Sequence, residues 1–350
     1  MIDRALAATG SLRAVALLRI AAGPLLLLHL TPFFADALDG TIPGDTFVLP
    51  YADWYPVLPR PLYLTALWLM VPVAVAVSAG LATRAATVAA AAFTAYNLFF
   101  SQTHFHHNRA FLLILLVGLA VLRSGDHLSV DRWLRRRPPE PAPLWPLWLL
   151  RIEVALVYAA SGFSKLVDGD WFGGTVLRLR IEQWRDVALD RGAPEWALDL
   201  LADPTFMAGF AKVVVLTELF IGVGFLWRRT RLAAVWVAIP FHLVIEATAS
   251  VQVFSVAGLA ALVIWVTPTD HDRLLWAPTG HPLRRAVRRL DWTGRFTVLD
   301  GPLRLDDRGT MRSRRNAVLA VLSRLPLTFW FVAPLRLLRQ PDRRAVDSTA

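Results

Sequence analysis

The stretch LLRIEVALVYAASGFSKLVDGDWFGG, residues 149–174, decides the fold because it runs from an apolar helix into a turn rich in Gly, Asp and Trp. Its apolar part is close to the ~20 mostly apolar residues that a membrane-spanning helix requires. Lys165 ends that part, in a chain whose other basic residues are almost all arginine. A lysine there indicates either an anchor at the lipid headgroups or a functional amine.

The composition of the whole chain is that of a membrane protein. Of its 350 residues 55% are hydrophobic and 14 are tryptophan, whose ring favours the headgroup level of a bilayer. The net charge of +10 comes from arginines gathered between apolar blocks, so we expect a lipid partner and no nucleic acid. The absence of cysteine excludes disulfides and thiolate ligands. The preference for Arg and Ala indicates a GC-rich bacterial genome.

The apolar blocks predict an all-α, polytopic transmembrane helical bundle. We expect eight spans, near residues 14–34, 62–82, 85–101, 109–123, 145–166, 206–227, 232–250 and 253–267. Arginines in the short connections place both termini in the cytoplasm and the long loops 35–61 and 167–205 outside. The predicted location is a bacterial inner membrane.

An internal repeat suggests two halves of four helices each. LLRIAAG begins at Leu17 and LLRIEVA at Leu149, and an arginine-bearing hairpin follows the second helix of each set. Parallel repeats of this kind place a site at the interface between the halves.

The chain changes character after Pro268, so we divide it into a membrane domain, residues 1–268, and a cytoplasmic Arg-rich segment, residues 269–350. TGRFTVLDGPLRLDDRGTM, residues 293–311, predicts a small hairpin. The apolar helix that follows has arginines at its edges, which predicts an interfacial amphipathic helix on the anionic inner leaflet. A ninth span is the alternative.

Charged side chains inside the spans are the strongest pointers to a site, because each costs about 2.5–3.5 kcal/mol at the centre of a span. Tyr158, Ser161, Gly162 and Lys165 lie along one stripe of the fifth span. A stripe of small and polar residues faces other helices, where burial makes a lysine a candidate general base.

His242 and Glu246 share a face of the seventh span, four residues apart. A structural hydrogen bond between them is the simpler interpretation, and a proton relay is the functional one. Glu218 lies near the middle of the sixth span, on roughly the opposite face from Lys212, and Lys212 is a candidate partner of Glu246. The outer half of the bundle thus gathers Lys165, Lys212, the His242–Glu246 pair and the histidine cluster of residues 104–108, and this convergence predicts a site there.

Two other groups of polar residues need an interpretation. SQTHFHHNRAF, residues 101–111, places His104, His107 and Asn108 before the fourth span. The chain lacks a metal-binding spacing of the HExxH type, so we expect no metal. Arg19 and Arg151 lie near the inner ends of their helices, where we expect them to reach the lipid headgroups.

The stretch around Lys165 resembles the HTTM (horizontally transferred transmembrane) family, the membrane domain shared with vitamin K-dependent gamma-carboxylases. TELFIGVGFLWRRTRLAAVWVAIPFHL, residues 217–243, and VFSVAGLAALVIW, residues 253–265, are similar to the same family. HHNRAFLLILLVGLAVLRSGDHLSVDRW, residues 106–133, resembles its Asn/His-led helix, although Arg109 follows Asn108 where the carboxylase pattern has His. The resemblance covers roughly residues 10–268.

The resemblance implies that Lys165 is the base that deprotonates a reduced quinone, either menaquinone or a vitamin K-like quinol, with His242 and Glu218 as catalytic partners. The residues expected to contact this cofactor are Tyr158, His107, Asn108, Trp171 and Glu246. Carboxylase-like, quinol-dependent chemistry in a pocket that opens outward is therefore the first hypothesis. A non-catalytic maturation or immunity factor for an exported peptide is the second, and a small-solute transporter is the third.

Overall fold

The computed structural model describes residues 7–42, 49–102, 105–136, 140–190, 192–249, 253–265, 273–307 and 309–337. The chain forms two compact units, residues 1–265 and 266–350.

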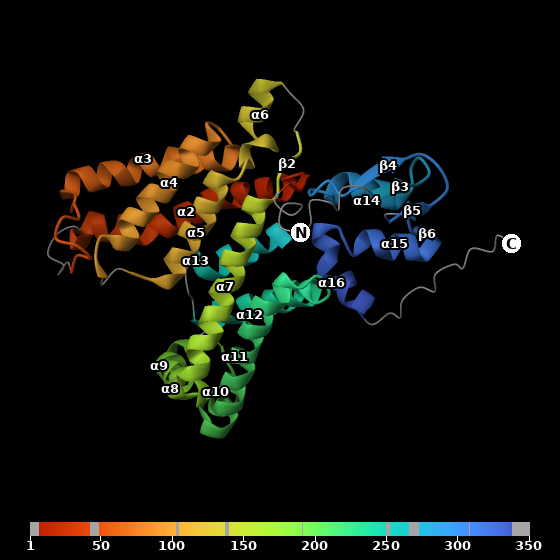
Figure 1. Ribbon diagram of the computed structural model, residues 1–350. Helices are drawn as coiled ribbons and strands as arrows, with labels where there is room; N and C mark the ends of the chain where they lie inside the picture. The colour runs from red at the N-terminus through yellow and green to blue at the C-terminus, as the bar shows by residue number, and fades with distance from the viewer. Residues whose placement is uncertain are drawn as a thin grey trace. The chain divides into compact units, whose positions relative to one another are not determined.

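The first unit is built of helices that coincide with the predicted spans (Figure 1). They are α2 (Arg13–Asp39), α3 (Arg60–Ala79), α4 (Thr83–Phe99), α5 (His107–Val121), α7 (Trp145–Val167), α11 (Pro204–Leu226), α12 (Arg231–Ala249) and α13 (Val253–Ala261) with the 3-10 turn η4 (Leu262–Trp265). Among the described residues, α2, α3, α7 and α11 are the helices long and apolar enough to cross a membrane. That all eight helices span a membrane stays a prediction.

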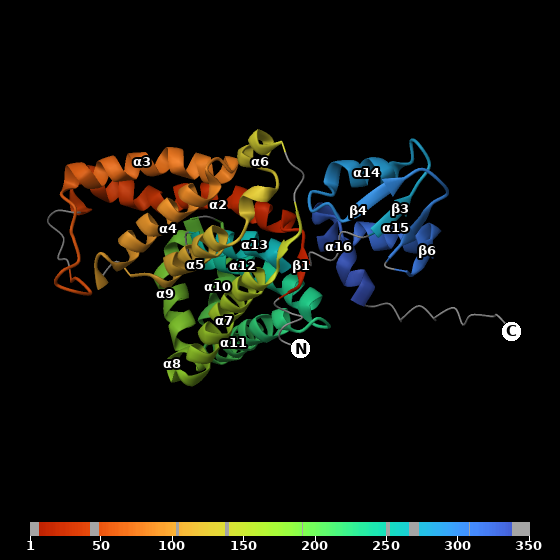
Figure 2. The same ribbon diagram turned by 45° about the horizontal axis from the view of Figure 1, so that its top comes forward.

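Small residues allow two pairs of helices to pack closely. A Cβ on Gly23 of α2 would lie 2.3 Å from the carbonyl oxygen of Ala74 in α3. A Cβ on Gly222 of α11 would lie 3.0 Å from the carbonyl oxygen of Ala155 in α7. Backbones that approach so closely are typical of helix pairs inside a membrane. Figures 1 and 2 show α2 and α3 side by side along their length.

The prediction that Arg19 and Arg151 reach the headgroups is wrong, because both are buried. Arg19 donates to the carbonyl oxygens of Val77 and Ser78, at 2.7 and 2.6 Å, where α3 ends. Its Nη2 donates to the carbonyl oxygen of Leu128 at 2.5 Å. Arg151 donates to the carbonyl oxygen of Ile264 in η4 from both Nε (2.9 Å) and Nη2 (2.7 Å). The last carbonyl groups of a helix have no N–H partner within the helix, and a guanidinium has enough donors to satisfy several of them.

The connections of the first unit also contain regular structure. The predicted outer loop 167–205 forms α8 (Gly169–Phe172), α9 (Thr175–Asp190) and α10 (Glu195–Ala202). The connection between α5 and α7 contains the 3-10 turn η3 (Ser124–Asp126) and α6 (Val130–Arg135). Strands β1 (Thr9–Gly10) and β2 (Ala142–Pro143) pair antiparallel and join the beginnings of α2 and α7.

The second unit contains a four-stranded sheet in the order β4-β3-β5-β6. Its elements are β3 (Arg273–Trp276), α14 (Pro282–Leu290), β4 (Phe296–Leu299), β5 (Arg304–Asp306), β6 (Met311–Ser313), α15 (Arg314–Leu322) and α16 (Pro326–Leu337). Strand β3 pairs parallel with β4 and antiparallel with β5, so it separates the two parts of the segment expected to form a hairpin. The hairpin that forms is β5–β6.

The second unit has its own hydrophobic core. Leu275 of β3 and Leu305 of β5 are fully buried beneath Leu283 and Val287 of α14 and Val321 of α15. Helix α16 exposes apolar side chains four residues apart, namely Leu327, Phe331 and Leu335. Its predicted place at a membrane surface stays a prediction.

Candidate functional site

The residue that ends the fifth predicted span forms an ion pair with the next long helix. Lys165 Nζ, near the end of α7, lies 2.7 Å from Oε1 and 2.6 Å from Oε2 of Glu218 in α11. It also donates to Ser161 Oγ at 2.7 Å, and that hydroxyl in turn donates to the Glu218 carboxylate at 3.2 Å. The pair is mostly hidden from solvent, with 16% of the lysine side chain and 6% of the glutamate side chain exposed.

This geometry saturates the lysine. An ammonium group has three N–H donors, and here two acceptor oxygens belong to one carboxylate and the third to a hydroxyl. A neutral amine therefore requires one proton to move to Glu218, which already touches it.

The close packing of α7 and α11 brings these residues together. A Cβ on Gly162 would lie 3.1 Å from the backbone nitrogen of Leu219, so the glycine allows the two backbones to approach closely. Gly162 and Leu219 directly follow Ser161 and Glu218 in the chain. The stripe that the sequence indicated therefore does face another helix.

Tyr158 and His242 form a second pair, one helical turn from Ser161. Tyr158 Oη and His242 Nε2 are 2.5 Å apart and buried. A Cβ on Gly258 of α13 would lie 2.3 Å from the His242 ring, so α13 packs directly on the imidazole. His242 Nδ1 has no hydrogen-bond partner among the described residues.

Trp171 covers the lysine. Asp168 begins α8 by accepting hydrogen bonds at Oδ1 from the backbone nitrogens of Asp170 (2.9 Å) and Trp171 (3.1 Å). The centroid of the Trp171 ring lies 5.1 Å from Lys165 Nζ, within range of a cation–π contact. Arg180 Cζ of α9 lies 5.8 Å from the same centroid.

The start of α5 lies close enough to Arg180 of α9 for the arginine charge to act on His106. The pKa of His106 is lowered, first by partial burial and then by the positive charges of His107, Arg109 and Arg180. His107 is exposed and packs against the His106 ring at 5.4 Å between centroids. Asn108 is half-buried in the first turn of α5. His104 lies outside the described residues.

Other predicted relations are not formed. Glu246 is exposed on α12, and in the described part of the chain it is hydrogen-bonded neither to His242 nor to Lys212. Lys212 Nζ lies 5.5 Å from the centroid of the Phe172 ring. Neither a His242–Glu246 relay nor a Lys212–Glu246 pair is therefore present.

Sequence reasoning missed a set of buried polar residues in α2, α3 and α4. Tyr63 of α3 donates to Asn97 Oδ1 of α4 at 2.9 Å. In the described residues, Asn97 Nδ2 and both ring nitrogens of His29 in α2 lack partners. The signal was available, since His29 and Asn97 are polar residues inside predicted spans.

The comparisons with known proteins give one match. A family model for the HTTM domain matches residues 11–269, which is most of the chain. No curated protein and no solved structure matches it.

Proposed function

Because the chain belongs to the HTTM family, a carboxylase-like family of membrane proteins, we propose that it performs base chemistry on a reduced membrane quinone with Lys165 as the base. The observation that supports this most is the contact of Lys165 with both oxygens of Glu218 and with Ser161. It supplies an amine together with a group that can accept its proton. The proposed setting is a bacterial inner membrane, with the site near the outer surface.

The residues around Lys165 suit a quinol in three respects. The amine is an acceptor for a hydroxyl proton once its own proton has moved to Glu218. Trp171 offers a flat aromatic surface beside the amine, at 5.1 Å from Nζ. Lys165 is also the more exposed member of its ion pair, so it is the group of the pair that a small molecule would reach first. A bound quinol would supply an acidic hydroxyl group and two electrons.

The protein groups then have separate roles. Glu218 receives and returns the lysine proton, and Ser161 bridges the two groups so that the proton has a second hydrogen-bonded route. The buried Tyr158–His242 pair holds α7 against α12 and acts as a positioning element. Among the described residues, Lys165 is bonded to Ser161 and Glu218 and not to His107, Asn108 or Glu246, so their role as quinol contacts rests on the family resemblance alone.

The test is oxidation of reduced menaquinone by the purified protein, measured as oxygen uptake, with Lys165→Arg beside the wild type. Arginine keeps the charge and cannot serve as a base at neutral pH, so we expect activity to be lost while expression is kept. Lys212→Arg is the matched control, because Lys212 packs on Phe172 and takes no part in the ion pair. Wild-type protein that neither binds nor oxidises the quinol would refute the proposal.

A second candidate is a non-catalytic membrane factor for an exported peptide. The same ion pair favours it, since Lys165 and Glu218 tie α7 to α11 whether or not a proton moves. In that case Lys165→Arg keeps the protein's effect on peptide export, whereas the catalytic proposal requires its loss.

A further inference from the structure

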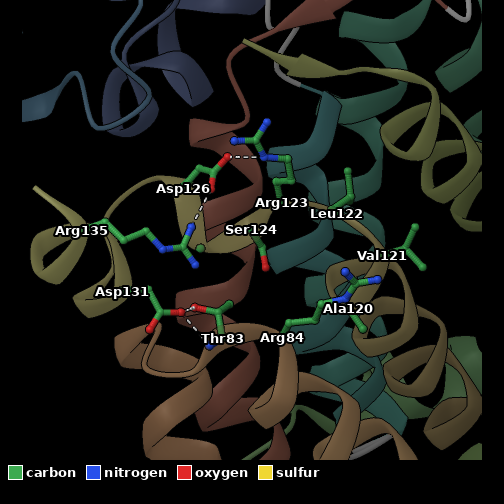
Figure 3. A pocket seen from close by; sticks show the side chains of 11 residues that line it. Thr83, Arg84, Ala120, Val121, Leu122, Arg123, Ser124, Asp126, Asp131 and Arg135 are labelled. Carbon is green, nitrogen blue, oxygen red and sulfur yellow. Dashed lines mark hydrogen bonds and ion pairs between the residues drawn. The ribbon is translucent and has the colours of Figure 1, made fainter. Parts of the chain in front are cut away.

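A cavity of about 200 Å³ lies at the end of the first unit where α4 begins and α5 ends (Figure 3). Its wall is formed by the first turn of α4, the last turn of α5, the segment that follows α5, and α6. Arg84, Arg123 and Arg135 line it together with Asp126 and Asp131. The cavity lies at the opposite end of α5 from His107, which is the first residue of that helix.

The Asp131 carboxylate accepts hydrogen bonds from the start of α4. Its Oδ1 accepts from the backbone nitrogen of Ala82 at 2.8 Å, and its Oδ2 accepts from the backbone nitrogen and hydroxyl of Thr83 at 2.8 and 2.7 Å. Burial opposes ionisation of Asp131, but these hydrogen bonds outweigh it and lower its pKa. Its negative charge therefore stabilises the N-terminus of α4.

The two aspartates of the cavity neutralise only part of the positive charge of its three arginines. Asp126 lies between Arg123 and Arg135, at 2.6 Å from Arg123 Nε and 3.8 Å from Arg135 Nη1 (Figure 3). The Arg123 and Arg135 side chains remain 47% and 64% exposed. Arg84 is exposed and has no hydrogen-bond or ion-pair partner among the described residues. The cavity thus holds one more guanidinium than carboxylate, and guanidinium groups match the oxygens of a phosphate.

An apolar surface continues from the cavity along both helices. Val121 lines the cavity and is 49% exposed, and Val117 one turn earlier in α5 is equally exposed. Val88, one turn after Arg84 in α4, is 51% exposed. A cationic cavity beside an exposed apolar strip suits a ligand with an anionic head and a hydrocarbon tail.

We propose that this cavity binds the phosphate group of an anionic phospholipid, with the acyl chains along Val88, Val117 and Val121. The arginine-rich ends of the helices are expected at the cytoplasmic face, where anionic lipids meet basic pockets between helices. Arg84 contacts the phosphate, while Asp126 orients Arg123 and Arg135. The lipid site is independent of the proposed chemistry at Lys165.

Native mass spectrometry of the detergent-purified full chain, titrated with phosphatidylglycerol, tests the proposal. We expect one lipid to bind tightly, phosphatidylcholine to bind more weakly, and Arg84→Gln to weaken phosphatidylglycerol binding about tenfold, which is 1.4 kcal/mol. Arg229→Gln is the matched control, because Arg229 is exposed in the short connection between α11 and α12. Thermal unfolding of the lipid-free variants, expected to equal that of the wild type, excludes misfolding as the cause.

Two further measurements separate a lipid from free phosphate. Val121→Gln removes part of the apolar strip, so it should weaken phosphatidylglycerol binding and leave the binding of inorganic phosphate unchanged. Equal lipid affinity in Arg84→Gln and Arg229→Gln would overturn the site. Displacement of the lipid by millimolar inorganic phosphate, with no effect of Val121→Gln, would overturn the lipid as its ligand.

Discussion

Glu218 keeps Lys165 inside the bundle, because an ammonium group with little access to water needs a counter-charge. Glu218→Gln keeps the shape of the side chain and removes its charge. We expect the free energy of unfolding to fall by about 1.5–3 kcal/mol, the range for hydrogen bonds to charged groups. The measurement is thermal unfolding of the detergent-purified protein, followed by circular dichroism.

Glu246→Gln provides the comparison for this prediction. Glu246 is an exposed carboxylate on α12, and exposed substitutions usually change stability by no more than about 0.5 kcal/mol. If both variants unfolded at the same temperature, the Lys165–Glu218 pair would not be an interior contact.

Single residues were easier to identify from the sequence than their partners. The cost of a charge in a span pointed to Lys165 and Glu218 one by one. Their pairing depends on how α7 and α11 are rotated against each other, which no spacing within one helix reveals. The same limit explains the error at Arg19, whose acceptors come from Val77 and Leu128, far away in the chain.

Among the elements, the contact between α7 and α11 is tightest at Gly222. Gly222→Ala would place a methyl group 2.9 Å from the backbone nitrogen of Ala159, so the helices must separate. We expect a loss of about 1–3 kcal/mol in the free energy of unfolding, as for other overpacked interiors. Chemical denaturation of the purified protein measures it.

Gly209→Ala tests the same change on the same helix without the contact. No atom lies within 4 Å of a Cβ built at Gly209, and alanine favours a helix by up to about 1 kcal/mol over glycine. We therefore expect this variant to be as stable as the wild type or more so. A loss in both variants would mean that packing against α7 is not the cause.

The elements themselves were predictable where hydrophobic blocks are long. Helices α2, α3, α7 and α11 lie within a few residues of the expected spans. The segment 167–205 carries too little continuous apolar sequence to indicate its three helices. The insertion of β3 between β4 and β5 depends on pairing across the second unit, which local turn signals do not encode.

At the scale of the whole molecule, the second unit should lose stability in acid. In the second unit, Asp307 accepts from Arg273 at 2.8 Å and from Arg324 at 2.8 Å. Burial opposes ionisation of Asp307, but these arginines outweigh it and its pKa lies below the ordinary value. The stabilisation is therefore complete above an unfolded-state pKa of about 3.9 and is lost as the pH falls through the lower folded-state pKa.

Hydrogen exchange of the full chain measures this at β3 and β5. At pH 6 we expect the wild type to be better protected than Asp307→Asn, and the difference to shrink toward pH 3. Asp300→Asn is the control, because the Asp300 side chain is 68% exposed and its pair with Arg284 is worth little. A difference that does not change with pH would contradict the role of Asp307.

For the whole molecule, the resemblance to the HTTM family was the most accurate prediction, since the match to the family model covers residues 11–269. The stretches that carry the resemblance, around Lys165 and His242, are each continuous in the sequence. The separation at residue 265 accompanies the end of the apolar sequence, close to the boundary expected at Pro268. The fold inside the second unit had no such motif to indicate it.

The buried position of Arg19 has a consequence for the order of events during biosynthesis. Its acceptors include the carbonyl oxygens of Ser124 and Leu128, more than one hundred residues later in the chain. When α2 first leaves the ribosome, those residues have not been translated. While the rest of the chain is still being made, α2 therefore carries a guanidinium that lacks several of its final acceptors, and we expect its stable insertion to depend on the later arrival of residues 124–128.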